Sequence, residues 1–239
     1  MSPRGVPVDP VERAGRILDA AARLLLRYGH DRTTINDIAR EAGIAKGSVY
    51  AHWRGRDRLF LALLRREQVI LLTEVRDRLR DAGRPADLEL LLVESVRAYQ
   101  RSPLITAVLT RDAEVLGGLA RAAAEEGPPS GGSTELVATL RDAGLVRTDR
   151  TLAEQVTVLS AMFLGYFLTA PLMPAEFRVP DDAVPGLVAD ATWRALQRPE
   201  PLTPVEVAEM DRAVRDQVDR ALAIAEERLH AALTTEETA

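Results

Sequence analysis

The segment from Thr33 to Trp53 alternates apolar residues with side chains that can donate hydrogen bonds. The apolar positions carry small or branched side chains that can lock two short helices together, and they are Ile35, Ile38, Ala39, Ala42, Ile44 and Val49. The polar positions gather at the end of the segment, where they are Lys46, Ser48, Tyr50 and His52. A helix that packs on one side and carries donors on the other can enter a DNA major groove.

Two short helices on either side of Gly43 would position these donors. Thr34 is expected to begin the first helix, and its hydroxyl and the backbone amides after it can hold a phosphate. Gly43 permits a left-handed turn that other residues resist. The second helix is expected from about Ala45 to Trp53, with Ala45 and Gly47 keeping its leading end slim. Two short helices joined by such a turn form a helix-turn-helix.

The charges of the chain are unevenly distributed. The net charge is −5, which alone argues against a nucleic-acid partner. Residues 1–66, however, carry 13 Lys/Arg against 7 Asp/Glu, whereas residues 67–239 carry 18 against 29. A basic head and an acidic body are expected when one end of a protein approaches phosphates.

Helical periodicity dominates the rest of the chain, and no alternating strand pattern persists. Asp9 and Pro10 are expected to start a first helix that ends at Gly29. Arg56 to Asp81 predicts a long connecting helix. Thr203 is expected to cap a last amphipathic helix of nearly thirty residues, which must lie on its own body or on a partner. Between these, helices are expected at about 86–101, 103–122, 134–143, 149–170 and 182–197.

The stretch from Ala14 to Leu64 resembles the TetR family of transcriptional regulators. It is similar to the family signature in its Thr-capped helix with Ile-Ala, its following Ala-Gly and its short helix with Gly, Tyr and an aromatic residue. Arg56-Asp57-Arg58-Leu59-Phe60 continues the match where the family usually has Lys-x-x-Leu. Two departures are Trp53, where Phe is common, and Arg56, where Lys is common.

The resemblance implies that one face of the head contacts DNA. Lys46 and Ser48 would point toward bases or nearby phosphates, and Gly47 would touch a base edge. Thr34, Tyr50 and His52 would hold the phosphate backbone. The full set of expected DNA-binding residues is Thr33, Thr34, Ala45, Lys46, Gly47, Ser48, Tyr50, His52 and Arg56.

The body resembles the family more weakly, and the resemblance implies a homodimer and a ligand cavity. Val158 to Leu168 is apolar on nearly all sides, so one face can cover the core while another meets a second subunit. An apolar or aromatic effector is expected, because few charges are buried by pattern. Ordinary core packing is the alternative explanation for the candidate ligand-binding residues, which are Tyr99, Leu104, Val108, Met162, Phe163, Tyr166, Phe167, Phe177 and Trp193.

The sequence gives little support for catalysis. His30, His52 and His230 are too scattered for a metal pair or a nucleophile relay, and no glycine-rich phosphate loop occurs. No catalytic residue, metal or cofactor is expected. The absence of cysteine and of a signal-peptide pattern suggests the cytoplasm. The apolar stretch Val156–Met173 is interrupted by polar residues and lacks basic flanks, so a buried helix is expected rather than a membrane span.

The sequence therefore predicts an all-α protein in four parts. Residues 1–9 are a disordered arm, 10–55 a helix-turn-helix DNA-binding domain, 56–202 a helical ligand-binding and dimerisation domain, and 203–239 a C-terminal amphipathic helix and tail. The expected function is a ligand-responsive regulator, most simply a repressor released from a palindromic operator on double-stranded DNA. An activator of the same fold, and a helical carrier or enzyme with an incidental helix-turn-helix-like packing, remain alternatives.

Overall fold

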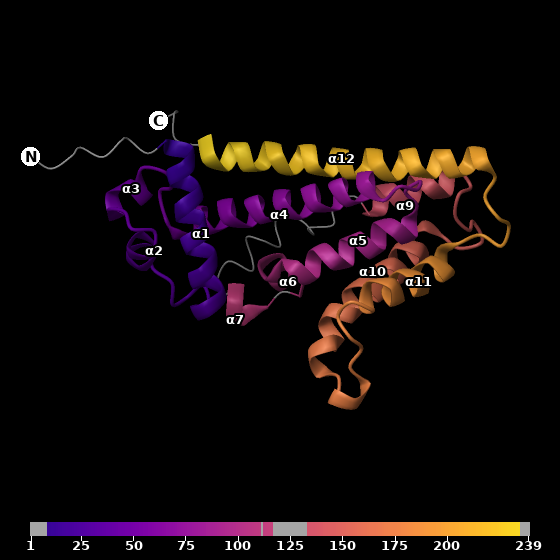
Figure 1. The fold of residues 1–239 in the computed structure, drawn as a ribbon, viewed down its shortest axis with the longest axis horizontal. Coiled ribbons are helices and arrows are strands. Elements are labelled where there is room, and N and C mark those ends of the chain that lie inside the picture. The colour runs from indigo at the N-terminus through magenta and orange to yellow at the C-terminus, as the bar shows by residue number, and fades with distance from the viewer. Residues whose placement is uncertain (1–8, 111, 117–132, 235–239) are drawn as a thin grey trace, which may run out of the picture.

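The computed structural model describes residues 9–110, 112–116 and 133–234. These residues form helices and no strands, as the sequence predicts, arranged as a small head and a larger body (Figure 1). Residues 1–8 of the predicted arm and residues 117–122 of the helix predicted over 103–122 lie outside the described residues. The all-helical prediction, with a three-helix head and a long C-terminal helix, is confirmed.

The head consists of α1 (Pro10–Tyr28), α2 (Ile35–Glu41) and α3 (Lys46–Tyr50). Asp9 caps α1 by accepting a hydrogen bond from the amide of Val11, and Gly29 ends the helix with a positive φ of 75°. The core of the head is closed by the first half of α4 (Arg56–Asp81), which contributes Leu59, Phe60 and Leu63 among others.

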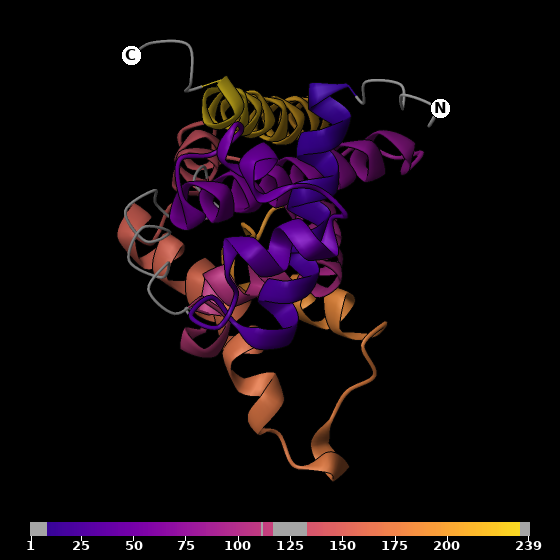
Figure 2. The ribbon, with the colours of Figure 1, turned by 90° about the vertical axis from the view of Figure 1, so that its left-hand side faces the viewer.

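The body is built around the second half of α4. It contains α5 (Leu88–Arg101), α6 (Pro103–Thr110), α7 (Ala113–Leu116), α9 (Ser133–Asp142), α10 (Leu152–Thr169) and α11 (Val184–Leu196), with 3₁₀ turns at Ala170–Leu172 and Ala175–Phe177. Figure 1 shows α4 lying between α5 and the long α12 (Pro204–Thr234). In Figure 2 the connection between α10 and α11 projects away from the rest of the body.

One predicted helix is divided in two. The sequence predicts a single helix over 103–122, whereas α6 ends at Thr110 and α7 begins at Ala113. Asp112 causes the restart, because its side chain accepts from the amide of Val115 and its own amide reaches back to the carbonyl of Ala107. A side chain that satisfies exposed helical amides favours a new helix start over continuation.

The last helix lies on the chain's own body. Met210, Val214, Val218 and Leu222 are almost fully buried along one stripe. Burial of an aliphatic side chain of this size contributes about 1.5–3 kcal/mol, so the stripe fixes α12 against α4. The sequence left open whether this helix packs on its own body or on a partner, and in the structure it packs on the body.

An ion pair anchors the start of α12. Arg198 contacts both carboxylate oxygens of Glu206 at 2.8 Å, and Glu206 also accepts from the amide and hydroxyl of Thr203. The Arg198 hydrogen bonds, followed by those from Thr203, lower the pKa of Glu206 from 4.5 to about 2. The charged carboxylate therefore stabilises the fold above about pH 4.5, and this stabilisation is lost as the pH falls from there to about 2.

We expect Glu206→Gln to lower the melting temperature at pH 7 because it removes the charged acceptor of Arg198. The difference from the parent should shrink as the pH falls from 4.5 towards 2. Thermal unfolding followed by circular dichroism at several pH values measures this, with Glu209→Gln on the exposed side of the same helix as control. A pH-independent difference would contradict the assignment.

Candidate nucleic-acid interface

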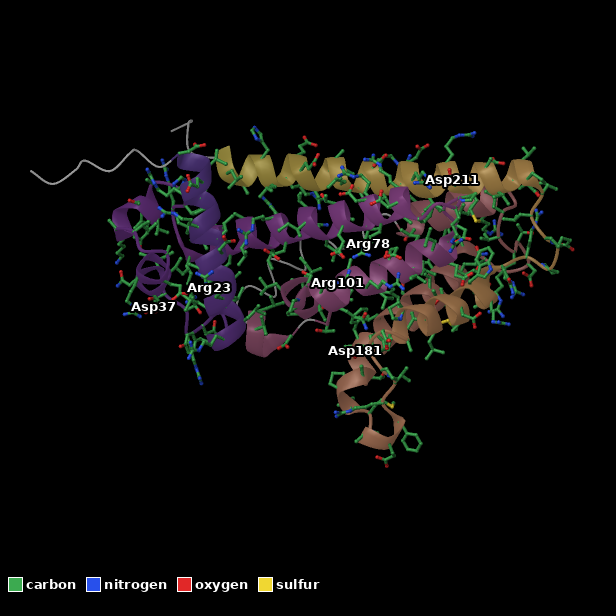
Figure 3. All side chains as sticks on the ribbon, viewed as in Figure 1. Arg23, Asp37, Arg78, Arg101, Asp181 and Asp211 are labelled. Carbon is green, nitrogen blue, oxygen red and sulfur yellow. The ribbon has the colours of Figure 1, made fainter. Side chains whose placement is uncertain are left out.

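The capping of α2 holds the turn that precedes it. The Thr34 hydroxyl accepts from the amide of Asp37, and the Asp37 carboxylate accepts from the amide and hydroxyl of Thr34. This reciprocal box lowers the pKa of Asp37 below its ordinary value, chiefly through the Thr34 hydroxyl. Arg40 also contacts Asp37, which is seen at the surface of the head in Figure 3. The start of α2 is therefore rigid and exposed.

The third helix is shorter than predicted but occupies the predicted place. It spans Lys46–Tyr50, with Ala45 at its N-cap, rather than Ala45 to Trp53. The amide of Trp53 still bonds to the carbonyl of Val49, four residues back, while the amide of His52 bonds to the same carbonyl, three residues back. The last turn tightens because Val49 and Trp53 are both buried in the core of the head.

The outer side of α3 carries the predicted donors. Ala45, Lys46, Gly47 and Tyr50 are exposed. The Lys46 ammonium lies 5.7 Å from the centre of the Tyr50 ring, so a cation and an aromatic hydroxyl share one patch. Gly47 has no heavy atom within 4 Å of the position that a Cβ would take. The leading end of the helix is thus both cationic and slender.

Other residues of the predicted DNA-binding set are less exposed to solvent. Ser48 and His52 are half-buried, and the His52 ring packs near the ring of Trp53. Arg56 is turned inward, because its guanidinium donates to the carbonyls of His30 and Thr33 at 3.2 and 3.4 Å. The Arg56 side chain is still partly exposed, so its charge remains near the surface, and its N–H groups bind the loop between α1 and α2.

Thr33 lies inside the head. It is 1% exposed, and its hydroxyl donates to the carbonyl of Gly29 at 2.8 Å. The side chain is thus engaged within the protein, unlike that of the neighbouring Thr34. The sequence pattern gave both threonines the same role because only tertiary packing separates them.

The sequence analysis considered His30 only as a metal or catalytic candidate, and it did not name two exposed arginines. His30 is almost fully buried against Phe60, with its ring nitrogens 3.0 and 3.1 Å from Asp31 and Asp57, and its amide bonds to the carbonyl of Val115 in α7. Arg32 and Arg54 are exposed at either end of the helix-turn-helix. These two arginines could have been predicted from the sequence, because they directly flank the helix-turn-helix.

The candidate ligand residues are divided between two regions. Tyr99, Phe163, Tyr166 and Phe167 form a cluster of rings with centroids 5.1 to 5.8 Å apart. Burial raises the pKa of Tyr99 above its ordinary value. Trp193 packs against the same body core, as Phe163 and Tyr166 do. In contrast, Leu104 and Val108 belong to the core of the head.

A cavity of about 250 Å³ lies beside the aromatic cluster, between the end of α10 and the start of α11. Tyr166 and Phe177 are the candidate residues that line it, together with Met173, Arg178 and Asp181. Met162 and Phe177 are exposed, at 37% and 69%. No group of three or more His, Cys, Asp or Glu residues that could hold a metal ion occurs within the described ranges.

Comparison with known proteins identifies the head. Residues 17–63 match the profile described as "Bacterial regulatory proteins, tetR family". An HTH-type transcriptional repressor of Mycobacterium tuberculosis is 36% identical over 55 residues, which are 23% of this chain and 29% of the relative. The HTH-type transcriptional activator FasR of Mycolicibacterium smegmatis is 34% identical over 77 residues, which are 32% and 35% of the two chains. The chain thus matches about a third of the length of these relatives.

The structural likeness extends over the body. The complex of SmeT with triclosan superimposes with a TM-score of 0.51 at 20% identity, covering 80% of this chain and 99% of that chain. SmeT is described as the repressor of a multidrug efflux pump of Stenotrophomonas maltophilia. This likeness shows the fold of the body. Residues 17–63 therefore match the bacterial tetR family of regulatory proteins, and the chain shares its fold, over 80% of its length, with the SmeT repressor.

Proposed function

We propose that the protein is a homodimeric transcriptional regulator that binds double-stranded DNA through its head and a small apolar or aromatic molecule through its body. The observation that carries the proposal is the exposed face of α3, where Lys46 and Tyr50 flank the bare backbone of Gly47. A rigid, slender and cationic helix of this kind is suited to a major groove.

We propose the following roles for the head residues. Lys46 and Ser48 are assigned to base edges or nearby phosphates, and Gly47 allows the backbone to approach the bases. Thr34 holds the start of α2, whose first backbone amides are offered to a phosphate, while Tyr50 and His52 contact the sugar-phosphate backbone. Thr33 and Arg56 act indirectly by holding the loop that presents Thr34. Arg32 and Arg54 are added as phosphate contacts.

A second copy of the chain is the proposed partner of α10. Its exposed face contains Thr157, Ala161 and Leu168 and no charged side chain from residue 155 onward. The stretch Leu152–Leu172 is apolar and long enough to cross a membrane by length and composition alone. Only 17% of its apolar 18-residue window is buried within the chain, so the sequence prediction of a buried helix is wrong for the single chain. Pairing of two such faces would cover this surface and set the two heads side by side.

The effector is assigned to the aromatic region of the body. The ring cluster of α5 and α10 and the adjoining cavity offer apolar contacts, with Arg178 and Asp181 at the cavity lining for a polar substituent. The triclosan complex of a protein with the same fold supports an aromatic ligand. We propose that the protein represses transcription, although the relatives include both a repressor and an activator.

Duplex binding should depend steeply on salt. Several phosphate contacts release counterions, so the logarithm of affinity should fall linearly with the logarithm of salt concentration, by about 0.9 for each contact. Fluorescence anisotropy with a duplex selected from a random library measures the slope. A flat response, or failure to retain any duplex from the library, would exclude this function and favour a helical carrier or enzyme.

We expect Lys46→Ala and Tyr50→Phe to weaken binding to that duplex without unfolding the protein or dissociating the dimer. Each removes a donor from the exposed face of α3, and loss of the lysine should also reduce the salt slope by about one contact. Arg212→Ala, on the exposed side of α12, removes one charge from the body and serves as the matched control. Parent-like binding by both head variants would mean that α3 is not the DNA-reading helix.

Gly47→Ala should separate stability from binding. The backbone conformation suits alanine and no atom lies near its Cβ, so the head should be unchanged or more stable by about 0.5–1 kcal/mol. The same methyl group would stand between the helix and a base edge, and duplex affinity should fall. Denaturant unfolding and anisotropy measure the two effects, and unaltered affinity would remove Gly47 from the interface.

Dimerisation should be sensitive to charge on α10. We expect Ala161→Glu to raise the dimer dissociation constant by at least about tenfold, because it buries an unpaired carboxylate between the subunits. Sedimentation equilibrium measures the dissociation constant. Ala208→Glu, at an exposed position of α12, controls for the added charge. A dimer that tolerates Ala161→Glu would place the subunit contact elsewhere.

A further inference from the structure

The last helix contributes to both hydrophobic cores of the protein. Near its start, Met210, Val214 and Val218 belong to the core of the body. Near its end, Ala232 packs against the core of the head. Between them the buried stripe continues through Leu222 and Ala225. The helix therefore spans the junction that α4 also spans, and the two helices lie side by side along it (Figures 1 and 2).

Hydrogen bonds to the backbone fix the body end of α12. The Asp211 carboxylate accepts from the amide of Ala86 at 2.6 Å, and Arg215 donates to the carbonyl of Leu79 at 3.0 Å. Asp211 also contacts Arg215, and Figure 3 shows it where α12 passes over the body. Because each bond involves a main-chain group, it sets the position of α12 along the body.

A further backbone bond and an apolar contact fix the head end. Arg65, just after the head portion of α4, donates to the carbonyl of Arg228 at 3.2 Å. Ala232 lies one turn further on and is half-buried against the head. The two helices run in opposite directions, so the start of α4 meets the end of α12. Both ends of α12 are thus attached, one to each part of the protein.

A single helix that connects two domains can bend and rotate, whereas two packed helices attached at both ends resist these motions. We propose that α12 is a brace that holds the head at one orientation relative to the body. Its attachment through Arg65 and Ala232 makes α4 and α12 move as one unit. The effect on DNA rests on the proposed function, but the brace is a property of the protein alone.

The orientation can be measured without DNA, because the chain has no cysteine and labels can be introduced cleanly. Arg40→Cys in α2 and Arg194→Cys in α11 place two nitroxides at side chains that are 80% and 70% exposed. Dilution with unlabelled protein isolates pairs within one subunit. Pulsed dipolar spectroscopy then gives the distribution of head-to-body distances.

Ala232→Arg places a bulky charged side chain at the contact with the head. We expect it to broaden the distance distribution at least about twofold, with the folding of the body unchanged. Ala231→Arg adds the same charge in the same turn but at an exposed position, and it should leave the distribution as narrow as in the parent. Equal widths for all three proteins would overturn the proposal.

Arg65→Met provides a second test in case Ala232→Arg fails to fold. It keeps the length of the side chain but removes the donor to Arg228, and we expect broadening in the same direction. A parent-like width in Arg65→Met, with Ala232→Arg unfolded, would also overturn the brace. Anisotropy with the selected duplex completes the test. If the variants broaden the distance distribution but the parent binds no duplex, the brace is upheld and the proposed function is rejected. If the variants keep a narrow distribution and the parent binds the duplex, the brace is rejected and the proposed function is upheld.

Discussion

The architecture depends on α4, a helix whose two halves belong to two different hydrophobic cores. The first half of α4 supplies Leu59 and Phe60 to the head, and its second half supplies Leu71 and Val75 to the body. Because both cores are built on this one helix, a displacement of one half shifts the other wherever packed neighbours keep α4 from bending. The head and the body are thus joined by a helix that is packed on both sides of the junction.

Contacts from helices other than α4 also hold the head against the body. The carbonyl of Val115 in α7 accepts from the amide of His30, and Leu104 of α6 enters the core of the head. These contacts approach from the side of α6 and α7, whereas α12 covers α4 along its length. A molecule bound among the rings of α5 and α10 lies close to α6 as well, since α6 packs on both of those helices. This arrangement gives the body a physical route to the head.

Local chemistry explains why several helix ends and turns could be predicted. Asp9, Thr34 and Thr203 each cap the helix predicted for them, and Gly43 takes the positive φ expected of a turn. These features depend on a few neighbouring residues and on steric limits that any chain obeys. The division of the 103–122 helix at Asp112 was missed because a cap inside a periodic segment competes with helix continuation.

Tertiary placement was harder to infer. Periodicity indicates that Leu104 is buried but not against which core, so a residue grouped with the ligand candidates belongs to the head. Thr33 and Thr34 are identical in type and adjacent in sequence, yet one hydroxyl is enclosed and the other exposed. The support of α12 was left open because its stripe of small and medium apolar residues fits an intramolecular or an intermolecular surface equally well. Contacts between residues far apart in sequence decide all three cases.

The opposite directions of α4 and α12 bring the end of the last helix back to the start of α1, as the two views of the ribbon show. A peptide tag, fluorophore or fusion partner at the end of α12 would begin beside the start of α1, and thus beside the head. Its charge and bulk would add to the field that a duplex meets, so such an attachment belongs on the far side of the body, for instance on the outer face of α11.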